Sequence, residues 1–167
     1  MITARDVAYL PGFISFVSAH DIERLIRGET RPRRLIERKD KDLTKRCYDY
    51  LKNRNIDFIK NDLEKSFTID DYLEIESTPD MYNEDSVVVC RMWCSSTKWT
   101  AKTIKPFYLL HTLLTGYFAG KKYAYLCVEY SKDRSFQCFK FEIEKWMKEI
   151  NKVLKCYDAI KKKCLSA

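Results

Sequence analysis

Glycine and proline are scarce in this chain, with four of each among 167 residues. The sequence also has no Gly/Ser-rich linker, no low-complexity tract and no internal repeat. Few chain breakers leave little room for long loops, and a chain of this length can bury a core without disulfides or metals. We therefore predict a single domain over residues 1–167, with a helical part over about 1–65 and a sheet-containing part over about 66–167.

Long apolar runs are absent as well: none approaches the ~18 residues that a membrane span needs. The start, MITARDVAYLPGF, lacks the basic region and apolar core of a signal peptide. We expect an intracellular protein, nuclear or cytoplasmic, with no membrane partner and with its seven cysteines as free thiols. The cysteines form no Cys-x-x-Cys pair and His20 lies far from His111, which disfavours a zinc site.

Acidic residues are fewer than basic ones, which gives the chain a net charge of +7. The segment from Arg24 to Arg46 holds ten Lys/Arg against four Asp/Glu, with Arg31, Arg33 and Arg34 grouped around a proline. Such clusters suit a polyanion, since each phosphate contact releases counterions. A solvated helix face explains the same charges equally well, so composition alone does not decide for nucleic acid.

The apolar pattern predicts helices and strands in alternation. Helical spacing and capping signals mark five helices, over residues 4–10, 18–28, 40–53, 106–119 and 142–163. Alternating or continuous β-branched runs mark four strands, over residues 72–76, 87–93, 123–130 and 136–141. We predict that these four strands are neighbours in one mixed sheet of an α/β sandwich.

Two stretches carry a resemblance to a known family. Pro79-Asp80 is followed by an acidic turn and the strand Val87–Trp93, and a helix with His111 leads to Gly116–Leu126. This arrangement resembles the lambda-exonuclease/YqaJ-like viral recombinase branch of the PD-(D/E)xK nucleases, in which a Ser-Pro-Asp-Gly turn precedes Glu-x-Lys-Cys-Pro. The resemblance extends roughly from Phe67 to Lys163 and implies a restriction-endonuclease-like mixed β-sheet flanked by helices.

The resemblance implies a degenerate catalytic site made of Asp80, Arg91 and His111. In the family, carboxylates hold Mg²⁺, which activates water, and the lysine orients that water or neutralises phosphate. Asp80 stands at the first metal-ligand position, whereas Val89 replaces the second acid, Arg91 the lysine and His111 the helix glutamine. Valine cannot bind a metal, and arginine does not substitute for an ammonium group. We expect no cofactor, and Mg²⁺ on Asp80 only if the protein is active.

Three functions follow from these observations. The first is a nucleic-acid-binding pseudo-nuclease, with Arg31, Arg33, Arg34 and Arg91 on phosphates. The second is a protein-interaction module on a degenerate nuclease fold, with an exposed surface around Trp93 and Trp99 as the interface. The third is an active Mg²⁺-dependent DNA exonuclease whose ligands have moved to other acids. The acids and lysines available for such a relocation are Glu76, Glu84, Asp85, Glu129, Lys98 and Lys102.

Overall fold

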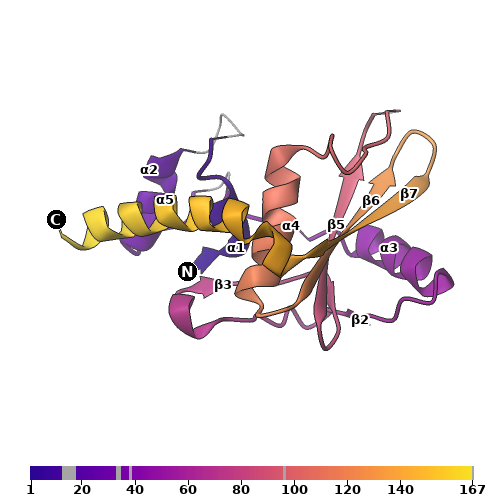
Figure 1. Cartoon of the computed structure of the whole chain (residues 1–167), viewed down its shortest axis with the longest axis horizontal. Coiled ribbons are helices and arrows are strands. Elements are labelled where there is room, and N and C mark those ends of the chain that lie inside the picture. The colour runs from indigo at the N-terminus through magenta and orange to yellow at the C-terminus, as the bar shows by residue number, and fades with distance from the viewer. Residues whose placement is uncertain (13–17, 33–34, 38, 96, 167) are drawn as a thin grey trace.

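A mixed five-stranded sheet forms the centre of the protein (Figure 1). The computed structural model describes residues 1–12, 18–32, 35–37, 39–95 and 97–166. In spatial order the strands are β2 (Ile59–Lys60), β4 (Met81–Tyr82), β5 (Ser86–Trp93), β6 (Tyr123–Tyr130) and β7 (Ser135–Glu142). Strands β5 and β6 are parallel and the other neighbours are antiparallel. The predicted α/β fold, with helices flanking a mixed sheet, is confirmed.

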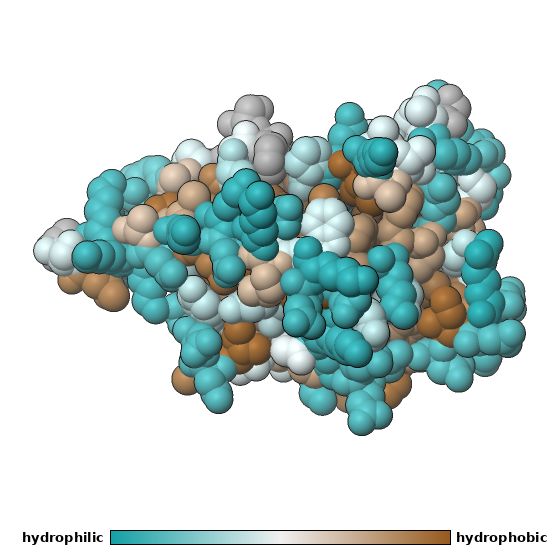
Figure 2. Space-filling model, in the orientation of Figure 1, coloured by the Kyte–Doolittle hydropathy of each residue, from teal (hydrophilic) through white to brown (hydrophobic). Residues whose placement is uncertain are grey.

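The two faces of the sheet are covered by different helices. Alternate residues of β5 point to opposite sides: Val88 and Cys90 pack with α3 (Lys41–Asn53), whereas Val87 and Val89 pack in the larger core with α4 (Pro106–Phe118). The larger core also includes α1 (Ala4–Ala8), α2 (Ala19–Ile26) and α5 (Met147–Leu165). Charged and polar side chains cover most of the face seen in Figure 2, with small apolar areas between them.

Gly116 lets helix α4 pack directly against the sheet. A methyl group at this position would come within 2.9 Å of the Ala124 Cβ atom on β6 and 2.8 Å of the Ile143 side chain. Both distances are shorter than van der Waals contact, so a larger residue would push the helix away. This contact sets the distance between α4 and the strands, and therefore the distance between His111 and the strands.

One predicted strand is wrong. Residues 72–76 do not join the main sheet: Asp70–Tyr72 form a 3-10 helix, and only Ile75–Glu76 (β3) is extended. Strand β3 pairs in parallel with β1 (Ile2–Thr3) in a separate two-stranded sheet. The apolar–acidic alternation has another cause, since Glu74 accepts hydrogen bonds from Lys161 and Tyr157 on α5.

The remaining predicted elements are found with small shifts at their ends. The helix predicted over 4–10 ends at Ala8, and the last helix starts with a 3-10 turn over Ile143–Trp146 before α5. Within the described residues, no helix combines the length and the hydropathy needed to cross a bilayer.

Candidate functional site

Asp80 is fixed between two strands of the sheet. Its backbone N–H donates to the Val88 carbonyl at 3.0 Å, and its own carbonyl accepts from the Asn61 N–H at 3.0 Å. The side chain then turns toward β5, where Oδ2 accepts from the Cys90 N–H at 2.8 Å. Both the backbone and one carboxylate oxygen of Asp80 are therefore held against the middle of the sheet.

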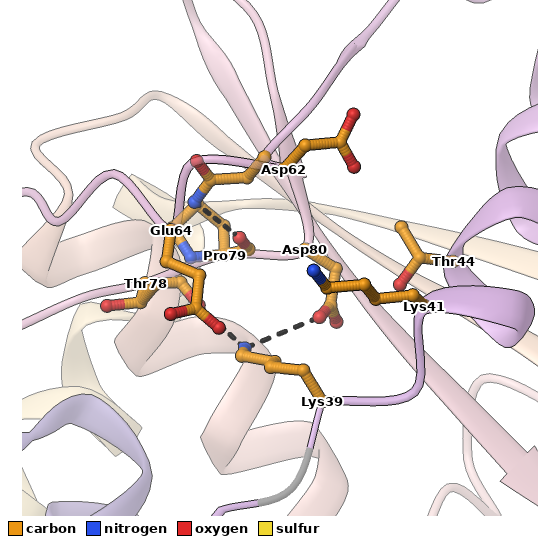
Figure 3. A pocket seen from close by; sticks show the side chains of 9 residues that line it. Lys39, Lys41, Thr44, Asp62, Glu64, Thr78, Pro79 and Asp80 are labelled. Carbon is orange, nitrogen blue, oxygen red and sulfur yellow. Dashed lines mark hydrogen bonds and ion pairs between the residues drawn. The ribbon is translucent and has the colours of Figure 1, made fainter.

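The second oxygen of Asp80 faces the ammonium group of Lys39 (Figure 3). Lys39 Nζ lies 3.3 Å from Asp80 Oδ1, 3.3 Å from Glu37 Oε1 and 2.9 Å from the Thr78 carbonyl oxygen. Burial disfavours the charged form, but the Asp80 and Glu37 carboxylates outweigh it and raise the pKa of Lys39. A permanent cation of the protein itself thus lies in front of Asp80.

Sequence reasoning missed both Glu37 and Lys39. They belong to an irregular segment before α3 that has no periodicity, and about forty residues separate them from Asp80. The only available signal was their place inside the basic segment, which favoured a solvated surface rather than a site.

Arg91 and His111 form a second contact beside Asp80. Arg91 Nη2 lies 3.0 Å from His111 Nδ1, and its guanidinium stands 5.1 Å from the centre of the Tyr108 ring. Burial, reinforced by Arg91, holds the pKa of His111 well below its usual value, so the ring is neutral and Nδ1 accepts the hydrogen bond. Burial and the nearby Arg5 lower the pKa of Arg91, whose Nε finds no partner among the described residues.

These residues line one cavity of about 210 Å³. The structure brings together all four positions that the resemblance singled out, from the residue before β4, from β5 and from α4, and adds two that it did not. The lining includes Asp80, Val89, Arg91, His111, Glu37 and Lys39. Val89 is 2% exposed and belongs to the core under α4, so the family's second-acid position is an apolar part of the cavity wall.

The cavity does not fit a magnesium ion. Mg²⁺ needs near-octahedral oxygen ligands, usually including one or two carboxylates. Here the two oxygens of Asp80 are taken by the Cys90 N–H and by Lys39. Among the residues that the structure describes, no three His, Cys, Asp or Glu side chains are placed to share a metal ion.

The acids proposed as relocated ligands lie elsewhere. Glu129 is on the opposite face of the sheet, where its Oε2 lies 2.6 Å from Arg46 Nε of α3. Glu76 pairs with Thr3 in the two-stranded sheet. None of these residues lines the cavity, and the same holds for the others proposed, Glu84, Asp85, Lys98 and Lys102.

The side chains of the basic segment from Arg24 to Arg46 differ in their environments. Arg31 binds the buried Asp6 with two hydrogen bonds of 2.8 Å and also donates to the Met1 and Leu35 carbonyls. The guanidinium of Arg31 is therefore held by contacts within the protein itself. Arg33 and Arg34, proposed as phosphate ligands, lie outside the described residues.

The aromatic surface expected around Trp93 and Trp99 is not open as predicted. Trp99 is only 4% exposed, and its backbone N–H donates to the Tyr130 hydroxyl at 2.8 Å. Trp93 packs on it, with ring centres 4.9 Å apart. Trp99 therefore belongs to the core and Trp93 is partly buried against it, which the sequence pattern did not indicate.

The fold resembles that of solved exonuclease structures. An alkaline exonuclease, LHK-Exo from Laribacter hongkongensis, matches with a TM-score of 0.65 and 12% sequence identity, over 99% of this chain and 88% of that chain. LHK-Exo in complex with dAMP matches with a TM-score of 0.62 and 13% identity, over 99% and 90%. No protein-family model and no curated protein matches the sequence. At this identity the likeness establishes the fold, a mixed sheet flanked by helices of the kind found in these exonuclease structures.

Proposed function

We propose that the chain is a nucleic-acid-binding pseudo-nuclease of the exonuclease and viral-recombinase type, which keeps the fold of a nuclease but does not cleave. One observation carries the proposal: the ammonium of Lys39 already neutralises the Asp80 carboxylate at 3.3 Å, where a nuclease would hold a metal ion. Because the lysine is covalently part of the chain, a divalent cation would have to displace a permanently charged group.

The neighbouring positions support the same proposal. The resemblance implies a second acid at the position of Val89, and valine offers no oxygen ligand to a metal ion. Arg91 keeps a positive charge at the lysine position but stays protonated, so it can contact a phosphate and cannot act as a base. His111 accepts the hydrogen bond from Arg91, which orients the guanidinium in the cavity.

The binding half of the proposal rests on charge and on the fold. The chain carries a net charge of +7, and the matched structures are exonucleases, one of them with dAMP bound. Arg91 lines the cavity, so an anion that enters it would meet a positive charge.

A cleavage assay and a binding assay test the two halves separately. We expect no loss of linear duplex or single-stranded DNA in Mg²⁺ or Mn²⁺, but retention of DNA on a filter at low salt. Degradation that disappears in Asp80→Ala, and persists in the surface control Asp133→Ala, would show an active enzyme instead. Absence of binding even at ~50 mM salt, which favours phosphate contacts, would point to a protein partner.

Restoring the family's residues gives a sharper version of the cleavage test. Val89→Glu with Arg91→Lys returns the acid and the lysine, and Lys39→Ala removes the resident ammonium. If Lys39 blocks the site, the triple variant should bind Mn²⁺ more tightly than the double variant, as measured by calorimetry. Equal affinities would contradict the role given to Lys39.

A further inference from the structure

Four cysteines form a row on the face of the sheet that α3 covers. The parallel register places Cys90 opposite Cys127, and the antiparallel register places Cys127 opposite Cys138. Cys47 of α3 is buried in the same cluster as Cys90 and Cys127, and Cys138 packs against it. Three adjacent strands therefore present a thiol at the same level, and the helix adds a fourth above them.

The pairing of β6 with β7 puts Cys127 and Cys138 at a non-hydrogen-bonded position. The Ile143 N–H donates to the Lys122 carbonyl at 2.9 Å, one step beyond the Tyr123–Glu142 pair. Hydrogen-bonded and non-hydrogen-bonded pairs alternate along an antiparallel ladder. Residue 127 lies an odd number of steps from residue 122, so its pair with Cys138 belongs to the non-hydrogen-bonded set.

That position suits a disulfide bond. The Cα atoms of a non-hydrogen-bonded pair lie about 4.5 Å apart, with the side chains close together. This separation falls inside the range of about 4.4–6.8 Å found between disulfide-bonded cysteines. The register therefore gives the two cysteines a Cα separation that a disulfide can span.

The two thiols differ in access to solvent. Cys127 is fully buried, whereas Cys138 is partly exposed on β7, which is an edge strand. The Cys138 and Cys47 thiols, together with burial, raise the pKa of Cys127. Tyr50 of α3 stacks on Phe136, two residues before Cys138, with ring centres 5.0 Å apart. Because Cys138 is the more exposed of the two thiols, a small oxidant reaches it first, and Cys127 remains a protonated thiol behind it.

We propose that Cys127 and Cys138 are a redox modification site, which closes into a reversible cross-strand disulfide when the protein meets a peroxide. The Cys138 thiolate attacks one oxygen of hydrogen peroxide, the O–O bond breaks, and the products are a sulfenic acid and hydroxide. The Cys127 sulfur then attacks Cys138 Sγ, the S–O bond breaks, and the departing hydroxide takes the Cys127 proton. Two thiols are oxidised by two electrons, and one peroxide becomes two waters.

The row also connects this site with the candidate cavity. Cys90 lies beside Cys127 in the sheet, and its N–H holds Asp80 Oδ2 at 2.8 Å. The proposal itself does not depend on nuclease ancestry, because it rests only on strand register and exposure. Peroxide chemistry at Cys138 can therefore be tested whether or not the protein binds nucleic acid.

Peptide mapping tests the proposal directly. In a background of Cys94→Ser, Cys156→Ser and Cys164→Ser, the protein is titrated with hydrogen peroxide, alkylated and digested with trypsin. Lys132 and Arg134 lie between the two cysteines, so trypsin separates them into different peptides. We expect a cross-link between the Cys127 and Cys138 peptides that lacks two hydrogen atoms and disappears with dithiothreitol, together with a higher melting temperature for the oxidised protein.

Single replacements assign the order of events. Cys138→Ser should remove the cross-link, whereas Cys127→Ala should stop the reaction at a Cys138 sulfenic acid that dimedone traps. Circular dichroism confirms that each variant folds. A cross-link from Cys127 to Cys47, or Cys138 oxidised without any cross-link in the folded background protein, would overturn the proposal.

Discussion

Two carboxylates, Asp6 and Asp80, are held by basic side chains from the same short segment, and the two contacts differ in kind. Arg31 clamps Asp6 with two hydrogen bonds of 2.8 Å, and Asp6 is 1% exposed. Lys39 reaches Asp80 through a single contact of 3.3 Å inside a cavity, and shares its charge with Glu37. A guanidinium fork matches a carboxylate in geometry, whereas an ammonium is a point charge that several oxygens can share.

The comparison shows that one basic cluster in a sequence can serve two purposes. The Asp6 pair ties the segment to the capping box of α1, so its role is structural. The Asp80 pair leaves both partners in contact with a cavity, where an approaching anion or cation would change it. Counting charges along the chain could not separate these roles, because it does not show which of them find carboxylates.

Arg31→Ala should have the largest effect on stability. It leaves the buried Asp6 carboxylate without its cation, and breaking one side of a buried ion pair costs about 3–5 kcal/mol. Urea unfolding followed by circular dichroism measures the loss. Arg27→Ala is the matched control, because Arg27 is 41% exposed and lies 4.0 Å from Glu23. If Arg31→Ala and Arg27→Ala unfold at the same urea concentration, the buried Arg31–Asp6 pair stabilises the protein no more than the exposed Arg27–Glu23 pair does.

The strands and helices that the sequence predicted well share one property. Strands β5 and β6 and helices α4 and α5 have apolar patterns that match their burial along most of their length. Val87–Val89 is continuous and β-branched, as is typical of a strand with both faces covered, and the structure covers both faces. The positions Asp80, Val89, Arg91 and His111 came from the family resemblance, and they line one cavity.

The failures have physical causes as well. Residues 72–76 alternate as a strand does, yet Glu74 is satisfied by Lys161 and Tyr157 of α5 rather than by water. Lys39 reaches Asp80 from an irregular segment, so no local pattern could announce it. Tertiary contacts between segments far apart in sequence decide both cases, and such contacts leave no periodic signal.

His111 should make stability depend on pH. Its folded-state pKa is depressed by burial, so the unfolded chain takes up the proton first as pH falls below about 6.5. This contribution is fully present above that pH and is progressively lost as the pH falls toward the folded-state pKa. His111→Gln still accepts a hydrogen bond from Arg91 but does not titrate. Its urea midpoint should fall less than that of the wild type between pH 7 and pH 5; equal losses would contradict the neutral, buried ring.

Lys39→Met should cost less than Arg31→Ala, about 1–2 kcal/mol, because Asp80 keeps the Cys90 N–H and the cavity admits water. The effect of Lys39→Met on metal binding should be clearer than its effect on stability. Removing the ammonium leaves Asp80 and Glu37 without a shared cation, so Mn²⁺ should raise the melting temperature of Lys39→Met and leave that of the wild type unchanged. Lys41→Met, on the first turn of α3, is the control that keeps the ammonium of Lys39. A wild-type shift as large as that of the variant would show that Lys39 does not compete with a cation.

The smallest effect, and the one that separates the cavity from the Arg31–Asp6 pair by function, is on the salt dependence of binding. Each duplex phosphate contact contributes about −0.9 to the slope of log K against log salt. Arg91→Gln should therefore flatten the slope by about one unit if Arg91 meets a phosphate, almost equally for all sequences. Arg33→Ala with Arg34→Ala tests the proposed contacts outside the described residues in the same way. Arg31→Lys should leave the slope unchanged, because that side chain is committed to Asp6. A flatter slope in Arg31→Lys with none in Arg91→Gln would reverse the comparison and place the phosphates at Arg31 instead of at the cavity.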